Sequence, residues 1–414
     1  MEIRIGGHTI KLYNEVNINL KYDCIADTFS FALYFDPTNT AHKSIFKPCT
    51  YQTCKIYHGG VLVMTGTVLS HNFGSAGNPP KQLVYISGYS VTGVLDDSCI
   101  LRTDLNEANG GIVVSASSPT VTIPGSSLQF DGLTLEQIAG LVTGWYEFKV
   151  IVDAELKTDA QFTKPFPNIV AAETDVTKTK PTQSVGDFLD QLCKQKNVVL
   201  SHTKDGNVLI TRHKSDKILT TTETIVNVSS TSFDDSLAGA PPSTAVSKKI
   251  TSKNRKILFD FNNKGQWTKM SLNVDGQKLH RLIQVVGQHQ DGTEDNALDS
   301  GIANPYVAQA VNRYVRIIQT SGDSNDTPDT ARSILGDELK SIVLTIEIQG
   351  WTLGGNLVTP NQLVSVQNDE LYLFNKNTWF IQEVALHGDE KEETAVLTCV
   401  LPYCFGDDEV KNIF

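Results

Sequence analysis

The sequence has no long apolar run. Its longest apolar stretches fall well short of the ~18 residues needed to cross a bilayer, and charged residues make up 20% of the 414-residue chain. The first ten residues, Met1 to Ile10, alternate polar and apolar instead of passing from a basic start to an apolar centre, so they do not resemble a signal peptide. We therefore expect a protein made in the cytoplasm and not inserted into a membrane.

The sequence also lacks an excess of basic residues. It has 35 Lys and Arg against 46 Asp and Glu, which gives a formal net charge of −11. A surface that holds nucleic acid neutralises phosphates with Lys and Arg, so this balance argues against such a surface. It is compatible with a channel that nucleic acid passes through, or with solubility alone. The four tryptophans show no alternating basic and aromatic pattern, and we expect them to pack in the core or at interfaces: Trp145, Trp267, Trp351 and Trp379.

Two common catalytic signatures are missing. There is no phosphate-binding loop of the form G-x-x-x-x-G-K-S/T and no zinc-protease H-E-x-x-H motif. The segment Gly88 to Gly93 resembles the G-x-S-x-G nucleophile elbow of hydrolases around Ser90, but it has one residue too many before the second glycine. We therefore favour a turn at the end of a strand over a catalytic Ser90.

Disulfide and metal sites have little support. The seven cysteines are an odd number and are scattered along the chain, several of them in apolar contexts, so we expect free buried thiols. One group of residues has the types that bind zinc, although its spacing fits a zinc finger only loosely: His42, Cys49, Cys54 and His58. Ordinary strand and loop roles are the favoured interpretation.

Acidic pairs are the remaining candidates for chemistry. Asp96-Asp97 and Asp234-Asp235 have the residue type needed for acid–base catalysis, but nothing in the sequence places either pair in a cleft. We expect both pairs to lie in solvated turns. The sequence therefore predicts no catalytic residue, no cofactor site and no metal site.

The sequence is β-rich at both ends. Near the start, Lys55–His58 and Val61–Val68 flank the pair Gly59-Gly60, which predicts a hairpin because both turn positions favour positive φ. The segment His71–Lys81 is rich in Gly, Asn and Pro and predicts a loop. Strands resume around Lys256–Phe259 and Arg281–Gly287, and the final segment from Ile342 onwards is β again. With helices in the middle, this indicates an α+β, β-dominated chain of several domains.

Two similar helix–strand units occupy the middle. Thr134 is placed to cap the first helix with Gln137 in the capping-box position, and Ser184 is placed to cap the second with Asp187 in the matching position. A short strand follows each helix. The regular spacing suggests a duplicated module, although any amphipathic helix before a strand has the same pattern.

An ordered series of short motifs carries a resemblance to a known family. Ile86 to Ser98 forms a strand end and an acidic turn, Ser184 to Leu189 opens a central module, and Leu344 to Trp351 leads to the strand Pro360 to Val366. In this order the sequence resembles the Mu-type contractile phage tail baseplate hub family. It departs from the family pattern at Tyr89, where the family often has Arg, and segment 236–264 has no counterpart.

The resemblance implies a structural, non-enzymatic protein of the virion tail baseplate. It implies a homotrimer that joins the hexameric tail tube to the trimeric central spike, contacts other baseplate proteins and passes DNA through a central bore without binding it specifically. From the net charge of −11 we expect the lining of that bore to be acidic. Two alternative functions from other protein classes are a tail-associated cell-wall hydrolase and a glycan-binding adhesin. An alternative more similar to the baseplate hub is the spike hub protein of type VI secretion.

The resemblance also predicts the division of the chain. We expect two β-barrel domains similar to tail-tube subunits, with small α/β modules between them. The predicted parts are 1–128 for the first barrel, 129–175 and 176–216 for two small modules, and 217–414 for the second barrel, with 217–300 able to complete either barrel.

Overall fold

The computed structural model describes most of the chain. It leaves out residues 11–12, 77–80, 101–129, 131, 145, 168, 170–182, 214–216, 228–243, 255, 263–266, 288–298, 320–325 and 407. The predicted turn at Asp234-Asp235 and the predicted packing of Trp145 lie outside the described residues.

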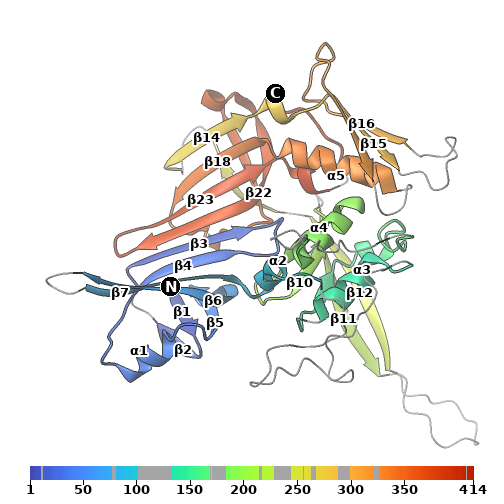
Figure 1. Ribbon diagram of the computed structural model, residues 1–414. Coiled ribbons are helices and arrows are strands. Elements are labelled where there is room, and N and C mark those ends of the chain that lie inside the picture. The colour runs from blue at the N-terminus through green and yellow to red at the C-terminus, as the bar shows by residue number, and fades with distance from the viewer. Residues whose placement is uncertain are drawn as a thin grey trace, which may run out of the picture.

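A 13-stranded sheet combines strands from both ends of the chain (Figure 1). Its N-terminal strands are β1 (Glu2–Ile5), β2 (His8–Ile10), β3 (Glu15–Lys21), β4 (Thr28–Tyr34), β5 (Thr53–His58), β6 (Val61–Ala76) and β7 (Lys81–Ser90). Its C-terminal strands are β13 (Ile257–Phe261), β14 (Lys269–Val274), β18 (Ile342–Gln349), β21 (Leu363–Asn368), β22 (Leu373–Asp389) and β23 (Glu393–Val400). The main path runs β14-β18-β23-β22-β3-β4-β7-β6-β5-β1-β2, and β21 joins β13 to β22. The described strands therefore make a β-dominated fold with a large, mainly antiparallel sheet, and they show no closed barrel.

The two ends of the chain meet where β3 pairs with β22. Ile18 lies opposite Leu386, Leu20 lies opposite Val384, and all four side chains are buried. One hydrophobic core runs continuously from the N-terminal to the C-terminal strands, because alternate residues of these strands point to the same side. Strands β13 and β14 pair with β21 and β18, so these parts of segment 217–300 join the C-terminal strands.

The hairpin prediction at Gly59-Gly60 is confirmed, and the loop prediction after it is wrong. Both glycines have positive φ between β5 and β6. The segment His71–Lys81 does not form a loop throughout, because β6 continues to Ala76 and pairs with β7, with Phe73 opposite Val84. Backbone pairing between two strands outweighs the weak local preference of Gly, Asn and Ser for turns.

A smaller α/β layer occupies the middle of the chain. Helices α3 (Leu135–Gly144) and α4 (Val185–Gln195) pack with β8 (Val150–Val152), β9 (Val199–His202) and β10 (Val208–Thr211). The sheet order is β8-β10-β9, so both helix–strand units feed one sheet and one hydrophobic core, called here the α/β module. Both caps are confirmed: the amide of Gln137 donates to Thr134 Oγ1 at 3.3 Å, and that of Asp187 donates to Ser184 Oγ at 2.9 Å.

A third layer contains a second small sheet and a long helix. Strands β15 (Leu282–Gly287), β16 (Asp299–Ala303) and β17 (Tyr314–Gln319) form this sheet, and α5 (Thr327–Leu339) packs against β15 and β16. Two further hairpins pair β11 (Lys217–Asn227) with β12 (Thr244–Asn254), and β19 (Thr352–Leu353) with β20 (Asn356–Leu357). The short elements α1 (Thr40–Ile45), α2 (Val94–Asp97) and η8 (Pro402–Phe405) complete the elements used below. None of the helices in the described part of the chain has the length and apolar content needed to span a membrane.

Candidate functional site

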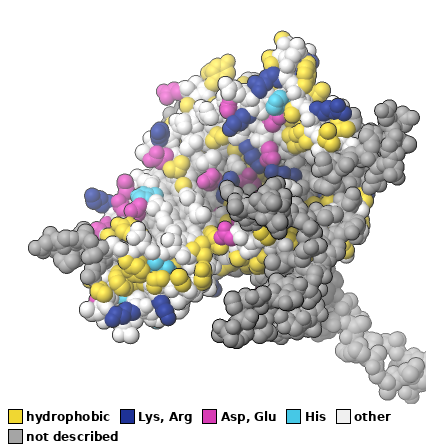
Figure 2. Space-filling view, in the orientation of Figure 1, with side chains coloured by type: hydrophobic (Ala, Val, Ile, Leu, Met, Phe, Trp, Pro, Cys, Tyr) yellow, Lys and Arg dark blue, Asp and Glu magenta, His cyan; other side chains and the backbone are white. Residues whose placement is uncertain are grey.

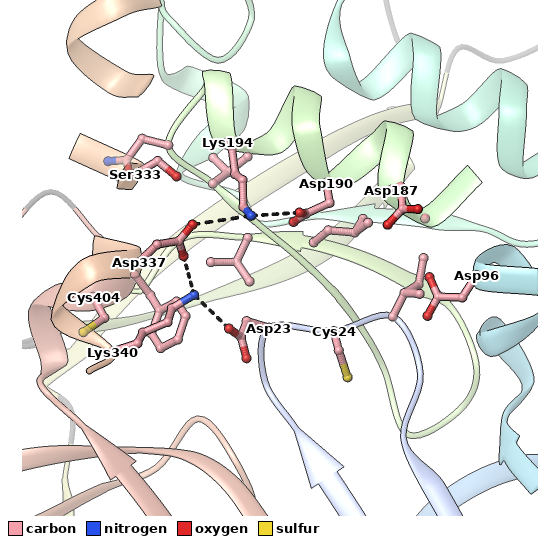
Figure 3. A pocket seen from close by; sticks show the side chains of 17 residues that line it. Asp23, Cys24, Asp96, Asp187, Asp190, Lys194, Ser333, Asp337, Lys340 and Cys404 are labelled. Carbon is pink, nitrogen blue, oxygen red and sulfur yellow. Dashed lines mark hydrogen bonds and ion pairs between the residues drawn. The ribbon is translucent and has the colours of Figure 1, made fainter. Parts of the chain in front are cut away.

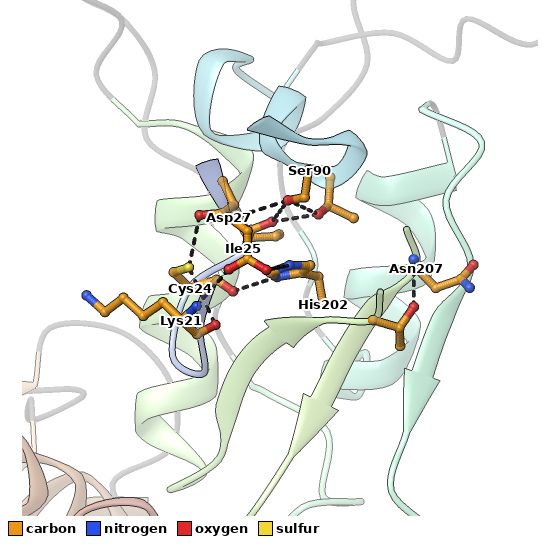
Figure 4. Close-up of polar contacts among 10 residues, drawn as sticks. Lys21, Cys24, Ile25, Asp27, Ser90, His202 and Asn207 are labelled. Atoms are coloured by element: carbon orange, nitrogen blue, oxygen red, sulfur yellow. Dashed lines mark hydrogen bonds and ion pairs between the residues drawn. The ribbon is translucent and has the colours of Figure 1, made fainter. Parts of the chain in front are cut away.

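Ser90 is a buried structural residue at the end of β7. Its side chain is only 1% exposed. Its hydroxyl accepts from the backbone N–H of Asp27 at 3.0 Å and lies 3.3 Å from the hydroxyl of Thr92 (Figure 4). The nearby imidazole of His202 bonds to Asp27 and to the carbonyl of Cys24, not to Ser90. Ser90 therefore holds the loop after β3 and has the strand-end role predicted for it.

The four zinc-type residues have separate surroundings. His42 Nδ1 accepts from the backbone N–H of Asp36, His58 lies 3.4 Å from Glu393, Cys54 is buried and Cys49 is exposed. Across the described residues, no group of three or more His, Cys, Asp or Glu is placed to hold a metal ion. All seven cysteines are free thiols.

Two of the predicted packing tryptophans lie in the core. Trp351 and Trp379 are fully buried, and the indole of Trp351 donates to the carbonyl of His387 at 2.8 Å. Trp267 is partly buried against the same core.

A cavity lies where the three layers meet, and we call its lining the charged junction (Figure 3). Its volume is about 210 Å³. The residues that line it come from the loop after β3, from helices α2, α4 and α5, from the start of β9 and from η8. Its charged side chains are Asp23, Asp96, Asp187, Asp190, Lys194, Asp337 and Lys340.

A chain of ion pairs crosses the charged junction. Lys340 Nζ lies 2.8 Å from Asp23 and 2.7 Å from Asp337. Lys194 Nζ lies 3.1 Å from Asp190 and 3.4 Å from the same Asp337. Burial alone would raise the pKa of Asp23, but the Lys340 ammonium outweighs burial and holds that pKa below its ordinary value. These pairs tie the loop after β3, helix α4 and helix α5 to one another.

Asp96 faces the first turn of α4 across a glycine. A Cβ added at Gly186 would lie 2.1 Å from Asp96 Oδ1, so the absent side chain permits this close approach. Burial, together with the negative charges of Asp187, Asp97 and Asp190, raises the pKa of Asp96 to about 6. The pKa of the Asp96 carboxyl is therefore well above that of an ordinary aspartate.

Two buried charged contacts attach the α/β module to the other layers. Lys196, at the end of α4, donates from Nζ to Asp326 at 2.7 Å, and both side chains are fully buried. His202 Nε2 lies 2.9 Å from Asp27 Oδ2, also well buried. Their partners are 130 and 175 positions away in sequence, so no local pattern could have identified either contact.

The charged junction is built mainly from ion pairs. Burial raises the pKa of Cys24 to about 12, so its thiol stays protonated and is a poor nucleophile. Most of the lining carboxylates are engaged with lysines. Among the described lining residues, no side chain with a nucleophilic oxygen or sulfur is hydrogen-bonded to a general base.

Comparisons with known proteins show which solved structures have a similar fold. No protein-family model matches the sequence, and no curated protein matches it. The 43 kDa tail protein of prophage MuSo2 from Shewanella oneidensis is 16% identical, with a TM-score of 0.64 over 98% of each chain. A tail protein from Neisseria meningitidis is 15% identical, with a TM-score of 0.65 over 98% of this chain and 97% of that chain.

A third similar structure comes from a secretion system. The c3393 protein of Escherichia coli, a component of the type VI secretion system that resembles phage tail proteins, is 8% identical, with a TM-score of 0.50 over 99% of this chain and 80% of that chain. The resemblance drawn from the ordered motifs is thus confirmed for the fold. Over nearly its whole length, this chain has the fold of prophage tail proteins.

Proposed function

We propose that this chain is the structural hub of a contractile phage tail baseplate. The observation that carries the proposal is the match in fold to two prophage tail proteins over at least 97% of every chain compared. The ordered motifs in the sequence support the same family independently of the coordinates. The protein then belongs to the virion, where it contacts the tail tube protein, the central spike protein and other baseplate proteins.

The proposed assembly is a homotrimer that adapts one symmetry to another. Residues 1–128 and 217–414 each supply a tube-like β-barrel domain, so three chains present six similar domains to the hexameric tube and threefold symmetry to the spike. The pairing of β3 with β22 supports this proposal, because hydrogen bonds between strands hold the two ends of the chain in a fixed relation. Segments 129–175 and 176–216 form the α/β layer between them.

The proposed role is passive towards DNA and not enzymatic. DNA would pass through the bore of the ring, and the net charge of −11 supports a bore that does not retain phosphates. The protonated thiol of Cys24 and the lysine-paired carboxylates of the charged junction support a structural role over the cell-wall hydrolase alternative. No observation favours a glycan-binding adhesin.

Light scattering of the purified chain tests the assembly. We expect a mass three times that of the 45.4 kDa monomer at low micromolar concentration, and a ring with a central opening in electron micrographs. A chain that stays monomeric both alone and when mixed with the tail tube and spike proteins of the same particle would overturn the proposal.

A further inference from the structure

We infer that the face of the small sheet β15-β16-β17 opposite to α5 is a contact surface between copies of this chain. The inference rests on the proposed homotrimer and assigns one of its interfaces. The sheet lies at the upper right in Figure 1, beside α5. Its surface was not identified by any motif in the sequence.

The two faces of this sheet have different surroundings. On the inner face, Ile283 and Val285 are fully buried, and α5 packs against β15 and β16 with Leu335 in the same core. Because alternate residues of a strand point to opposite sides, the neighbours of these residues point away from α5. Helix α5 therefore covers one side of the sheet, whereas the other side exposes Leu282 although Val286 on the same side is buried.

The outer face is apolar and exposed. Leu282 of β15 lies beside Tyr314 of β17, and Ile318 follows Tyr314 on the same side. These three side chains are 39%, 56% and 61% exposed. We call the exposed residues Leu282, Ala303, Tyr314, Arg316 and Ile318 the outer face; Gln284 and Val286, which the register places on the same side, are half-buried and buried. Figure 2 shows hydrophobic and basic side chains next to one another in this upper right part of the molecule.

Two arginines give this face a positive charge. Arg316 lies on it, and Arg281 donates to the hydroxyl of Tyr314 at 3.3 Å. Within the described part of the chain, no carboxylate lies within ion-pair distance of either arginine. The face is thus a cationic area on a protein whose net charge is −11.

The open edge of β17 adds to the case for a covering partner. Among the described strands, in the order β16-β15-β17, strand β17 is hydrogen-bonded on one side only. Proteins usually protect such an edge with charge or a covering element, because unpaired backbone groups beside apolar side chains invite association. Here the edge carries Ile318, which is more than half exposed.

A second copy of this chain is the occupant that fits these properties. Tyr and Arg are enriched where proteins meet, and the exposed apolar side chains suit a protein surface better than nucleic acid, which requires a predominantly basic surface. An acidic partner would complement these arginines, and the chain itself has 11 more acidic than basic residues. A cyclic trimer joins one surface of each chain to a different surface of the next, so a cationic face can meet an acidic one.

The test compares two matched isoleucines. Ile318→Asp places a charge on the outer face, and Ile151→Asp places the same charge on the edge strand β8 of the α/β module, where Ile151 is 41% exposed. We expect Ile318→Asp to raise the concentration for half-assembly at least about tenfold. Ile151→Asp is expected to leave it unchanged. Arg316→Glu, whose side chain is also exposed, is expected to act like Ile318→Asp.

Light scattering across a concentration series and thermal unfolding of each variant provide the readouts. A trimer that is unchanged in folded Ile318→Asp and Arg316→Glu proteins would overturn this interface and leave the proposed hub standing. A wild-type chain that is monomeric both alone and when mixed with the tail tube and spike proteins would remove the homotrimer and this interface together. If Ile318→Asp fails to fold, a photo-crosslinking residue at position 318 decides the matter, since a crosslinked dimer supports the contact and its absence from a trimeric sample refutes it.

Discussion

The ammonium of Lys196 lies 2.7 Å from a carboxylate oxygen of Asp326, and both side chains are fully buried. Lys196 follows the last turn of α4, and Asp326 precedes the first turn of α5. The ring of Phe166 also contacts the ammonium, with its centroid 4.7 Å from Nζ. This buried pair therefore connects the α/β module to the long helix of the third layer, in addition to the pair of Lys194 with Asp337.

Replacing one partner of this pair should destabilise the protein strongly. Asp326→Asn leaves the Lys196 ammonium buried beside a neutral group, and we expect a loss of about 3–5 kcal/mol in the free energy of unfolding. Lys196→Met with Asp326→Leu should lose much less, because no unpaired charge remains. Urea unfolding followed by circular dichroism measures both changes. Lys194→Met, in a half-exposed pair, is the control and should cost less than about 1 kcal/mol.

The contact between His202 and Asp27 should make stability fall as the pH rises. Burial alone would lower the pKa of His202, but the hydrogen bond and charge of Asp27 outweigh burial and raise that pKa above 6.5. Since the folded pKa is the higher one, the stabilisation is fully present below about pH 6.5 and is lost as the pH rises through the folded pKa. Melting temperatures between pH 5.5 and 8.5 measure this slope.

His202→Gln should flatten that slope. His8→Gln, which changes an exposed imidazole on β2, should preserve the wild-type pH dependence. An unchanged slope in His202→Gln would show that the pH dependence has another source.

Asp96→Asn should stabilise the protein at neutral and alkaline pH. The pKa of Asp96 is raised to about 6, so its ionisation in the folded state opposes folding above that pH. We expect a gain of less than about 1 kcal/mol at pH 8, because one side of Asp96 is exposed and water screens its charge. The gain should vanish near pH 4. Urea midpoints at both pH values test this, and Asp205→Asn in an exposed turn should change neither.

Gly336→Ala and Gly140→Ala should have opposite effects, although both glycines lie within helices. A Cβ at Gly336 of α5 would lie 2.3 Å from the backbone carbonyl oxygen of Cys404, so the helix would have to move away from η8. We expect a loss of about 1–3 kcal/mol. A Cβ at Gly140 of α3 would meet nothing within 4 Å, so Ala should add about 0.5–1 kcal/mol through helix propensity.

Equilibrium unfolding in urea measures both glycine variants. Equal effects of the two substitutions would mean that the contact between α5 and η8 is not tight in solution.

The sequence by itself determined the features that depend on neighbouring residues. The turn at Gly59-Gly60 follows from the freedom of glycine at positive φ, and the caps at Thr134 and Ser184 follow from hydroxyls placed next to unpaired amides. The order of short motifs was sufficient to indicate the family whose fold the chain has. The spacing of glycines around Ser90 indicated the end of a strand, and β7 ends at Ser90.

Only the tertiary structure decided which distant residues meet. The pairing of β3 with β22, the burial of Lys196 against Asp326 and the exposure of Ile318 depend on segments far apart in the chain. The alternation of residues in a strand predicts that one side of the strand is apolar. It does not predict which strand pairs with it or whether another layer covers the apolar side. Those outcomes depend on the combined burial and charge pairing of the whole chain, so local chemistry could not have predicted them.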